Sequence, residues 1–313
     1  MNLRRLIFLF MVFIFSAISA QASEKQTIIC STYPIFQITR NIVAGHSGIT
    51  VQLMIPAALG CPHDYALTPQ DMQKLAKADV MIVNGLGMEE YLGAPVEKAN
   101  PRIKVIDSSV GIKEILQYAE DDEHEEEHHD ASHDHDHEHS GANPHLFASP
   151  RMVGLLALNI AGELSQLDPA GAGTYLANAK VYAAKMNALA DEFSALGKRL
   201  KNNRIVTQHG VFDYLARDMG LEVVAVVQEH GGEAPSAAEI LTIVKTIKGK
   251  KAGAVFTEPQ YPAKVGQTIA REAGIVTATL DPVANGPENA SLDYYETVML
   301  QNLQILAKSL GSK

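Results

Sequence analysis

Histidine is the residue type best able to carry chemistry in this 313-residue chain, and its twelve copies fall into two groups. Seven of them lie close together: His124, His128, His129, His133, His135, His137 and His139. The other five stand singly, at His46, His63, His145, His209 and His230. Neutral imidazole is a good ligand for Zn²⁺ and other transition metals. Both groups therefore point to a divalent metal ion.

The clustered histidines lie in an acidic segment, residues 120–140. This segment contains eleven Asp or Glu residues and neither Lys nor Arg. It has too few apolar side chains to form a core, so we expect a mobile loop. A merely solvated charged loop would account for the acids but not for seven histidines. We predict several weak, exchangeable metal sites here, auxiliary to a tighter site elsewhere.

Three of the isolated histidines and one aspartate lie where an α/β fold presents side chains to a ligand. His209 and Asp281 each follow a short apolar segment with strand character, His63 lies in a loop after another, and His145 precedes a helix start. The carboxyl ends of parallel strands face the crevice in which open α/β sheets bind ligands. Three imidazoles and one carboxylate form a four-coordinate set suited to Zn²⁺. For any one of these histidines alone, a structural role is the simpler interpretation, but the shared placement favours ligation.

Glu258 also ends a segment with strand character. It could accept a hydrogen bond from a ligand imidazole or coordinate the metal directly, and we favour the first. His230 is expected in a loop, with a smaller chance of an auxiliary metal contact. His46 is expected in a surface turn.

Two runs of alternating strand and helix patterns surround these residues. In the first half we predict strands at 26–31, 49–55, 79–84 and 103–107, and helices at 35–44, 69–77 and 89–98. In the second half we predict strands at 204–208, 221–227, 252–257 and 275–280, and helices at 211–219, 235–248, 263–273 and 292–310. Such alternation predicts an α/β fold with two lobes, each built on a parallel sheet.

A long helical pattern, residues 173–201, separates the two halves. Its apolar stripe alternates spacings of four and three, at Tyr182, Met186, Leu189, Phe193, Leu196 and Leu200. We interpret it as a rigid helix joining the lobes. The predicted organisation is a signal peptide at 1–22, a first lobe at 23–168, a linking helix at 169–203 and a second lobe at 204–313.

The first 22 residues have the pattern of a secretory signal peptide. Arg4 and Arg5 precede an apolar stretch, and small residues flank a cleavage point after about Ala22. The mature protein is therefore expected in an exported compartment, the bacterial periplasm, as a monomer. The formal net charge is −10, but the acids are concentrated in residues 120–139 and no basic patch is visible, which argues against nucleic acid as a partner.

The chain contains two cysteines, Cys30 and Cys61. Two are too few for a cysteine metal cluster. Both are expected near strand ends of the first lobe, and an exported compartment permits a disulfide between them.

The order and content of the motifs resemble those of metal-specific solute-binding proteins of ABC importers, in particular the zinc branch. The resemblance rests on Gly60-Cys61-Pro62-His63, Asn143-Pro144-His145-Leu146, His209-Gly210-Val211-Phe212, Thr257-Glu258-Pro259-Gln260 and Leu280-Asp281-Pro282. It implies two βα lobes bridged by a long helix, with the metal held between them by His63, His145, His209 and Asp281. It also implies Zn²⁺ as the transported ligand and an inner-membrane ABC permease as partner.

A zinc enzyme is the first alternative to transport. Catalytic zinc sites also use three protein ligands, often histidines, and leave the fourth coordination position to water or substrate. Asp281 would fill that fourth position here. The sequence also contains no HExxH motif and no nucleophile elbow. We therefore expect no enzyme. A periplasmic zinc buffer or a surface adhesin could share the fold. Three imidazoles favour Zn²⁺ over Mn²⁺, which prefers more oxygen ligands.

Overall fold

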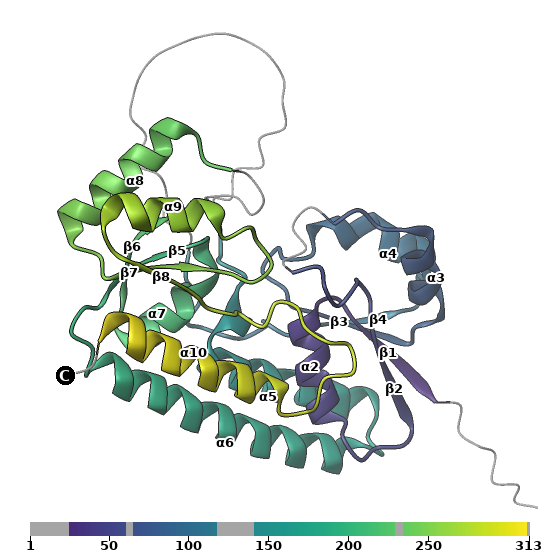
Figure 1. The fold of residues 1–313 in the computed structure, drawn as a ribbon. Helices are drawn as coiled ribbons and strands as arrows, with labels where there is room; N and C mark the ends of the chain where they lie inside the picture. The colour runs from purple at the N-terminus through teal and green to yellow at the C-terminus, as the bar shows by residue number, and fades with distance from the viewer. Residues whose placement is uncertain (1–24, 61–64, 118–140, 229–233, 312–313) are drawn as a thin grey trace, which may run out of the picture.

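The computed structural model describes residues 25–60, 65–117, 141–228 and 234–311 (Figure 1). The proposed signal peptide, the histidine-rich segment, Cys61, His63 and His230 lie outside these residues. Among the helices that are described, none has the length and apolar character needed to cross a membrane.

Each half of the chain forms a four-stranded parallel sheet, as predicted. The first sheet has the order β2-β1-β3-β4 and contains β1 (Gln26–Cys30), β2 (Ile49–Leu53), β3 (Val80–Val83) and β4 (Lys104–Asp107). The second has the equivalent order β6-β5-β7-β8 and contains β5 (Arg204–Thr207), β6 (Glu222–Val226), β7 (Ala254–Thr257) and β8 (Val276–Thr279). Because the two orders match, the carboxyl edges of both sheets are built by the same strand-to-helix connections.

The sheets are covered by short helices with clear start signals. The first lobe contains α2 (Tyr33–Ile42), α3 (Pro69–Lys77) and α4 (Gly93–Ala99), and the second contains α7 (Asp213–Met219), α8 (Ala237–Lys250) and α9 (Lys264–Ala273). α3 begins as the sequence predicts, with Thr68 as N-cap and Pro69 in the first turn. The Thr68 hydroxyl accepts from the Asp71 N–H at 3.2 Å, and the Asp71 carboxylate accepts from the Thr68 N–H at 2.9 Å. This reciprocal pair fixes where the chain enters the helix.

Three longer helices join the lobes: α5 (Pro150–Leu167), α6 (Ala172–Gly197) and α10 (Tyr294–Leu310). α6 runs along one side of the molecule, beside α5 and α10, and contacts α2 of the first lobe and α7 of the second (Figure 1). Its predicted apolar stripe is buried throughout. The sequence predicts one connecting helix, whereas in the structure α5 packs along α6. The connection is thus a helix pair, which resists bending better than a single helix.

A single hydrophobic core extends through both lobes and the helix pair. It includes Ile28 of β1, Leu156 of α5, Phe193 of α6 and Phe256 of β7. Smaller apolar clusters lie on the outer faces of the two sheets. Because the main core is continuous, moving one lobe against the other would disturb close packing at the centre of the molecule.

The segment 282–293, which follows β8, crosses back to the first lobe. Three side chains of α2 donate hydrogen bonds to its carbonyl oxygens: Tyr33 to Pro287 at 3.0 Å, Arg40 to Ala290 at 2.8 Å and Asn41 to Leu292 at 2.9 Å. The Gly286 N–H also donates to the Ala57 carbonyl at 3.0 Å. We call this segment the crossing strap. It ties the end of the second sheet to the first lobe.

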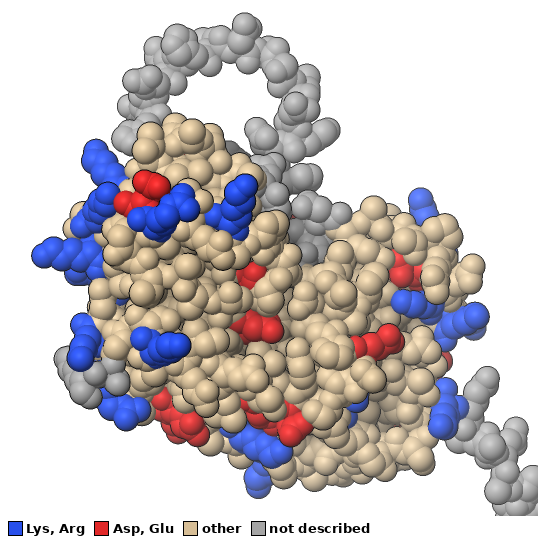
Figure 2. Space-filling model, in the orientation of Figure 1, with Lys and Arg blue, Asp and Glu red and all other residues tan. Residues whose placement is uncertain are grey.

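Charged side chains are unevenly distributed over the surface. Figure 2 shows Lys and Arg gathered on the outer side of the second lobe, and Asp and Glu scattered over the face in view. Lys245, Lys248, Lys250 and Lys251, at the carboxyl end of α8, are all exposed. Cations at a helix carboxyl terminus interact favourably with the helix dipole, which accounts for part of this group.

Candidate metal centre

Three of the singled-out acids and histidines follow adjacent parallel strands of the second sheet. His209 lies two residues after β5, Glu258 directly after β7, and Asp281 two residues after β8. Since β5, β7 and β8 are neighbours in the sheet, their carboxyl ends present these side chains along one edge. This edge faces the first lobe's connection to the helix pair, where His145 lies.

His145 and His209 come from opposite sides of the connection and lie together. His145 precedes the short 3₁₀ turn Leu146–Ala148, and α5 then begins after its N-cap Ser149. The two ring centroids are 5.1 Å apart, with the ring planes at 80°. The exposed fractions are 1% for His145 and 4% for His209. Two buried imidazoles held edge to face can reach one ion between them.

Glu258 fixes the orientation of the His209 ring. Its Oε1 lies 2.7 Å from His209 Nδ1, and its Oε2 accepts from Gln260 Nε2 at 2.5 Å. Burial raises the pKa of Glu258, while the charge and hydrogen bonds of His209 act in the opposite direction. With both oxygens engaged in this way, Glu258 acts as a hydrogen-bond partner of the imidazole. A donating Nδ1–H leaves the lone pair of His209 on Nε2.

His145 is oriented by a different partner, an amide. The Oδ1 of Asn143 lies 2.9 Å from His145 Nδ1 and accepts from the His145 N–H at 3.0 Å. An amide oxygen can only accept, so Nδ1 carries the proton and Nε2 the lone pair. Both histidines therefore present the same ring nitrogen for coordination.

Asp281 is held by both its backbone and its carboxylate. Its N–H donates to Asn302 Oδ1 at 3.0 Å, and Asn302 Nδ2 donates to its carbonyl at 2.7 Å. Its Oδ1 accepts from the Val283 N–H at 2.8 Å, and Val283 has a φ of +61°, a costly conformation for a β-branched residue. Burial raises the pKa of Asp281, and its negative charge in turn raises the pKa of Glu258. Asp281 thus lies within electrostatic range of Glu258, the partner of His209.

The described residues bring together only part of the predicted ligand set. His145 and His209 form a pair, with Glu258 on His209 and Asp281 nearby. His63 lies outside the described residues, and within those that are described no three His, Cys, Asp or Glu side chains are close enough to hold one ion. The four-ligand site of His63, His145, His209 and Asp281 therefore stays a prediction, as do the auxiliary sites of the histidine-rich segment.

Two other predictions concern residues near the first sheet. Cys30, at the end of β1, is buried, and burial raises its thiol pKa to about 12. Because Cys61 lies outside the described residues, the Cys30–Cys61 disulfide stays a prediction. His46 lies beside a turn, 3.6 Å from the Asp168 carboxylate and against the Tyr175 ring, well separated from the histidine pair in the fold.

Besides Asn143, sequence reasoning missed two residues of this region. The Gln260 side chain donates a hydrogen bond to Glu258. It also lies against Gly60, just before residues 61–64, since a Cβ added to Gly60 would be 3.0 Å from Gln260 Cγ. Asn302 is a buried amide on the inner face of α10. Its sequence signal is a polar residue on an otherwise apolar helix stripe, which suggests a partner but does not identify Asp281.

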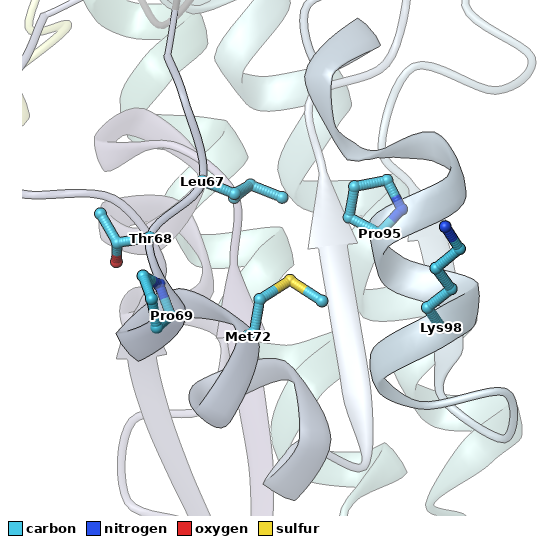
Figure 3. Close-up of a pocket in the computed structure, with 6 residues that line it drawn as sticks. All are labelled: Leu67, Thr68, Pro69, Met72, Pro95 and Lys98. Carbon is cyan, nitrogen blue, oxygen red and sulfur yellow. The ribbon is translucent and has the colours of Figure 1, made fainter.

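A cavity of about 540 Å³ lies elsewhere, between α3 and α4 on the first lobe (Figure 3). It is lined by Leu67, Thr68, Pro69, Met72, Pro95 and Lys98. The hydroxyl of Thr68 serves in the helix cap, and Lys98 would repel a cation. This lining is unsuited to a metal ion, so the histidine pair remains the better candidate for the metal site.

The family model and the similar proteins found by comparison agree on one family. Residues 28–309 match the family model described as ZnuA, zinc-uptake complex component A, periplasmic. The chain is 30% identical to the high-affinity zinc uptake system protein ZnuA of Bacillus subtilis over 291 residues, covering 92% of this chain and 88% of that one. It is 28% identical to the zinc-binding protein AdcA of Streptococcus pyogenes, covering 91% of this chain but only 56% of AdcA. The chain thus spans about half the length of AdcA.

A solved structure with the same fold is that of the solute-binding protein FpvC from Pseudomonas aeruginosa in complex with Ni²⁺. The TM-score is 0.76 at 28% identity, covering 91% of this chain and 97% of that one. Two lobes with parallel sheets, joined by long helices, are therefore shared along nearly the whole described chain. The chain belongs to the ZnuA family of zinc-uptake component A proteins.

Proposed function

We propose that the chain binds Zn²⁺ with high affinity in the periplasm and delivers it to an ABC-type importer in the inner membrane. The observation that carries this proposal is the His145–His209 pair. Two buried imidazoles from either side of the lobe connection stand 5.1 Å apart, each with Nδ1 engaged by an acceptor. Because both Nδ1 atoms carry the proton, the lone pair lies on Nε2 of both rings, which suits a metal held between the lobes.

His63 and Asp281 complete the proposed coordination. Asp281 supports this role through its position at the same sheet edge and its rigidly held backbone. Three neutral imidazoles and one carboxylate give the ion a four-coordinate shell with a single negative charge. The histidine-rich segment 120–140 would collect ions by weak, exchangeable binding. It precedes His145 in the chain, so captured ions would be close to the tight site.

Zinc is favoured by the nitrogen-rich donor set, since Mn²⁺ prefers oxygen ligands. The B. subtilis relative is named for zinc uptake, and AdcA for zinc binding. The fold does not itself select zinc, because FpvC has been solved with Ni²⁺. Uptake of another divalent metal such as Ni²⁺ or Mn²⁺ is therefore the alternative function.

Calorimetric titration of the metal-free protein tests the proposal. We expect one tight Zn²⁺ site plus weaker ones, with the tight site lost in His145→Ala and in His209→Ala. His46→Ala is the matched control and should leave the tight site intact, because His46 lies beside a turn against Asp168 and Tyr175. A tight site that survives in His145→Ala would refute the assignment. Tighter binding of Ni²⁺ or Mn²⁺ in competition, with zinc displaced from the purified protein, would favour the alternative.

A further inference from the structure

Every donor and acceptor of the Asn143 side-chain amide has a hydrogen-bond partner at the candidate metal centre. The side chain is completely buried. Its Oδ1 accepts from the His145 N–H at 3.0 Å and lies 2.9 Å from His145 Nδ1. Its Nδ2 donates to the Gly210 carbonyl and to Asp213 Oδ2, each at 2.9 Å. Two lone pairs and two N–H groups are all satisfied, which is the full inventory of an amide.

These partners define the orientation of the amide. The backbone N–H of His145 can only donate, so the atom facing it must be the oxygen. The carbonyl of Gly210 can only accept, so the atom facing it must be the nitrogen. The same orientation then requires His145 Nδ1 to donate. Asn143 therefore selects the tautomer of His145 that has its lone pair on Nε2.

The partners of Asn143 also lie on both sides of the lobe connection. Gly210 is the residue after His209, and Asp213 begins α7 in the same turn. The Asn143 amide thus bonds to the His145 ring through its oxygen. Through its nitrogen it bonds to the turn that follows His209. The distance between the two imidazoles depends on this bridge.

The backbone of Asn143 is anchored as firmly as its side chain. Its N–H donates to the Leu116 carbonyl at 2.8 Å, and its carbonyl accepts from the Tyr214 hydroxyl at 2.7 Å. The same hydroxyl accepts from the Leu116 N–H at 3.1 Å. Tyr214 belongs to α7, so the backbone bonds also join the first lobe's chain to the second lobe. Asn143 cannot shift without breaking bonds on both sides.

We propose that Asn143 is the positioning residue that sets both the tautomer of His145 and the spacing of His145 and His209 before metal arrives. This inference deepens the proposed function and rests on it for the identity of the ligands. A pair that is already ordered loses less conformational freedom when an ion binds. Asn143 should therefore contribute to affinity without touching the metal.

Two substitutions separate the two tasks of the amide. Asn143→Ala removes both the acceptor for His145 and the donor to the His209 turn. Asn143→Asp keeps an oxygen for His145 Nδ1 but places a second oxygen against the Gly210 carbonyl and Asp213. Asn178→Ala is the matched control, because Asn178 also joins two elements with its amide, donating to the Ile42 and Ala44 carbonyls at 2.9 and 2.8 Å, away from the site.

The experiment is ¹⁵N NMR of the imidazole rings in the metal-free protein, followed by Zn²⁺ titration of the same samples. In Asn143→Ala we expect His145 to change from the Nδ1–H form to a mixture of tautomers while His209, held by Glu258, keeps its form. Zn²⁺ affinity should fall roughly 10- to 100-fold. In Asn143→Asp the tautomer should be kept while hydrogen exchange in residues 209–213 becomes faster. Asn178→Ala should change neither the tautomers nor the affinity.

Several results would overturn the proposal. Wild-type tautomer and affinity in Asn143→Ala would exclude both tasks. A carboxylate at position 143 would also make His145 more basic, so the bridge is read from hydrogen exchange: wild-type exchange rates in residues 209–213 of Asn143→Asp would exclude the bridge to the His209 turn. A failure of the proposed function is distinguishable, since it would appear as weak Zn²⁺ binding by the unmodified protein or as a tight site that survives His145→Ala. The tautomer readout needs no metal and would still report on Asn143.

Discussion

At the scale of single residues, the two paired histidines differ in what holds them. His209 donates to a carboxylate, whereas His145 donates to a neutral amide. A carboxylate partner makes the imidazole a more basic ligand than an amide does. In the proposed site the two partners would therefore contribute differently: Glu258 would make His209 a stronger ligand, and Asn143 would position His145.

Replacing Glu258 by Gln tests the contribution of its charge. The substitution keeps an oxygen for His209 Nδ1 but removes the negative charge and turns an NH₂ group toward Gln260 Nε2. We expect Zn²⁺ affinity to fall by about 10-fold or more, as measured by competition with a chromophoric chelator. His46→Ala serves again as the control. Unchanged affinity in Glu258→Gln would mean that only the hydrogen bond matters.

Asn302 is the corresponding support for Asp281, and its removal should affect stability. In Asn302→Leu the buried N–H and carbonyl of Asp281 lose their partners, which should cost roughly 2–4 kcal/mol of unfolding free energy. Urea denaturation of the metal-free protein measures this. Gln304→Leu, an exposed position on the same helix, is the control and should change stability by less than about 0.5 kcal/mol. Equal effects of the two would show that Asn302 does not support Asp281.

At the scale of elements, the sequence predicts most of the fold because each strand and helix carries its own periodic pattern. The exceptions have tertiary causes. The long helix is predicted to continue to residue 201, but α6 ends at Gly197. A Cβ at that position would collide with the carbonyl of Met219, so the glycine is required by the close approach of the last residue of α7. Nothing in the local pattern indicates this contact.

The candidate site was harder to predict for a related reason. The histidines and acids could be chosen by type and by their place after strands. Their partners could not, because Asn143 and Gly210, or Asn302 and Asp281, meet only through the fold. The sequence around a buried Asn does not indicate which residue its amide will bond to in the fold. The sequence therefore indicates candidate ligands by type and position, but it does not indicate the amides that hold them.

The carboxyl ends of β1 and β3 are joined by another acid, Glu89. Its Oε1 accepts from the Ser31 hydroxyl at 2.6 Å and from the Asn84 N–H at 2.7 Å, and its Oε2 accepts from the Gly85 N–H at 3.1 Å. Burial, the largest influence, and the nearby charge of Asp107 raise the pKa of Glu89 from 4.5 to about 7. Between these pH values the folded protein holds a proton that the unfolded chain has lost.

This linkage predicts how stability depends on pH. Because the folded state binds more protons, the contribution of Glu89 is fully present below pH 4.5 and is lost as the pH rises toward about 7. Glu89→Gln, which cannot titrate, should show a smaller fall in unfolding free energy between pH 5 and pH 8 than the unmodified protein. Urea denaturation across this range is the measurement, with exposed Glu90→Gln as the control. Parallel pH profiles for all three proteins would contradict the assignment to Glu89.

At the scale of the whole molecule, three features oppose movement of one lobe against the other. The main core is continuous through both lobes, α5 and α6 form a packed pair, and the crossing strap is bonded to α2. The strap also connects two parts of the proposed metal site. It begins directly after Asp281 and reaches Ala57 and Ala58, just before residues 61–64. Disturbing it should therefore affect both the lobe contact and the proposed ligand loop.

Gly286 offers a direct test, because its N–H bonds to Ala57 of the first lobe and its Cα faces Tyr33 of α2. A Cβ on Gly286 would lie 2.5 Å from Tyr33 Oη and 2.8 Å from Tyr294 Cε1, so Gly286→Ala must displace one of these rings. We expect a loss of about 1–3 kcal/mol in unfolding free energy, together with faster hydrogen exchange in α2 and in residues 282–293. Gly249→Ala is the matched control: an added Cβ at this α8 position meets open space, and the change should stabilise the helix by up to about 1 kcal/mol. If Gly286→Ala left α2 and the strap exchanging at their original rates, the strap would not hold the lobes together, and the continuous core and helix pair alone would account for their fixed arrangement.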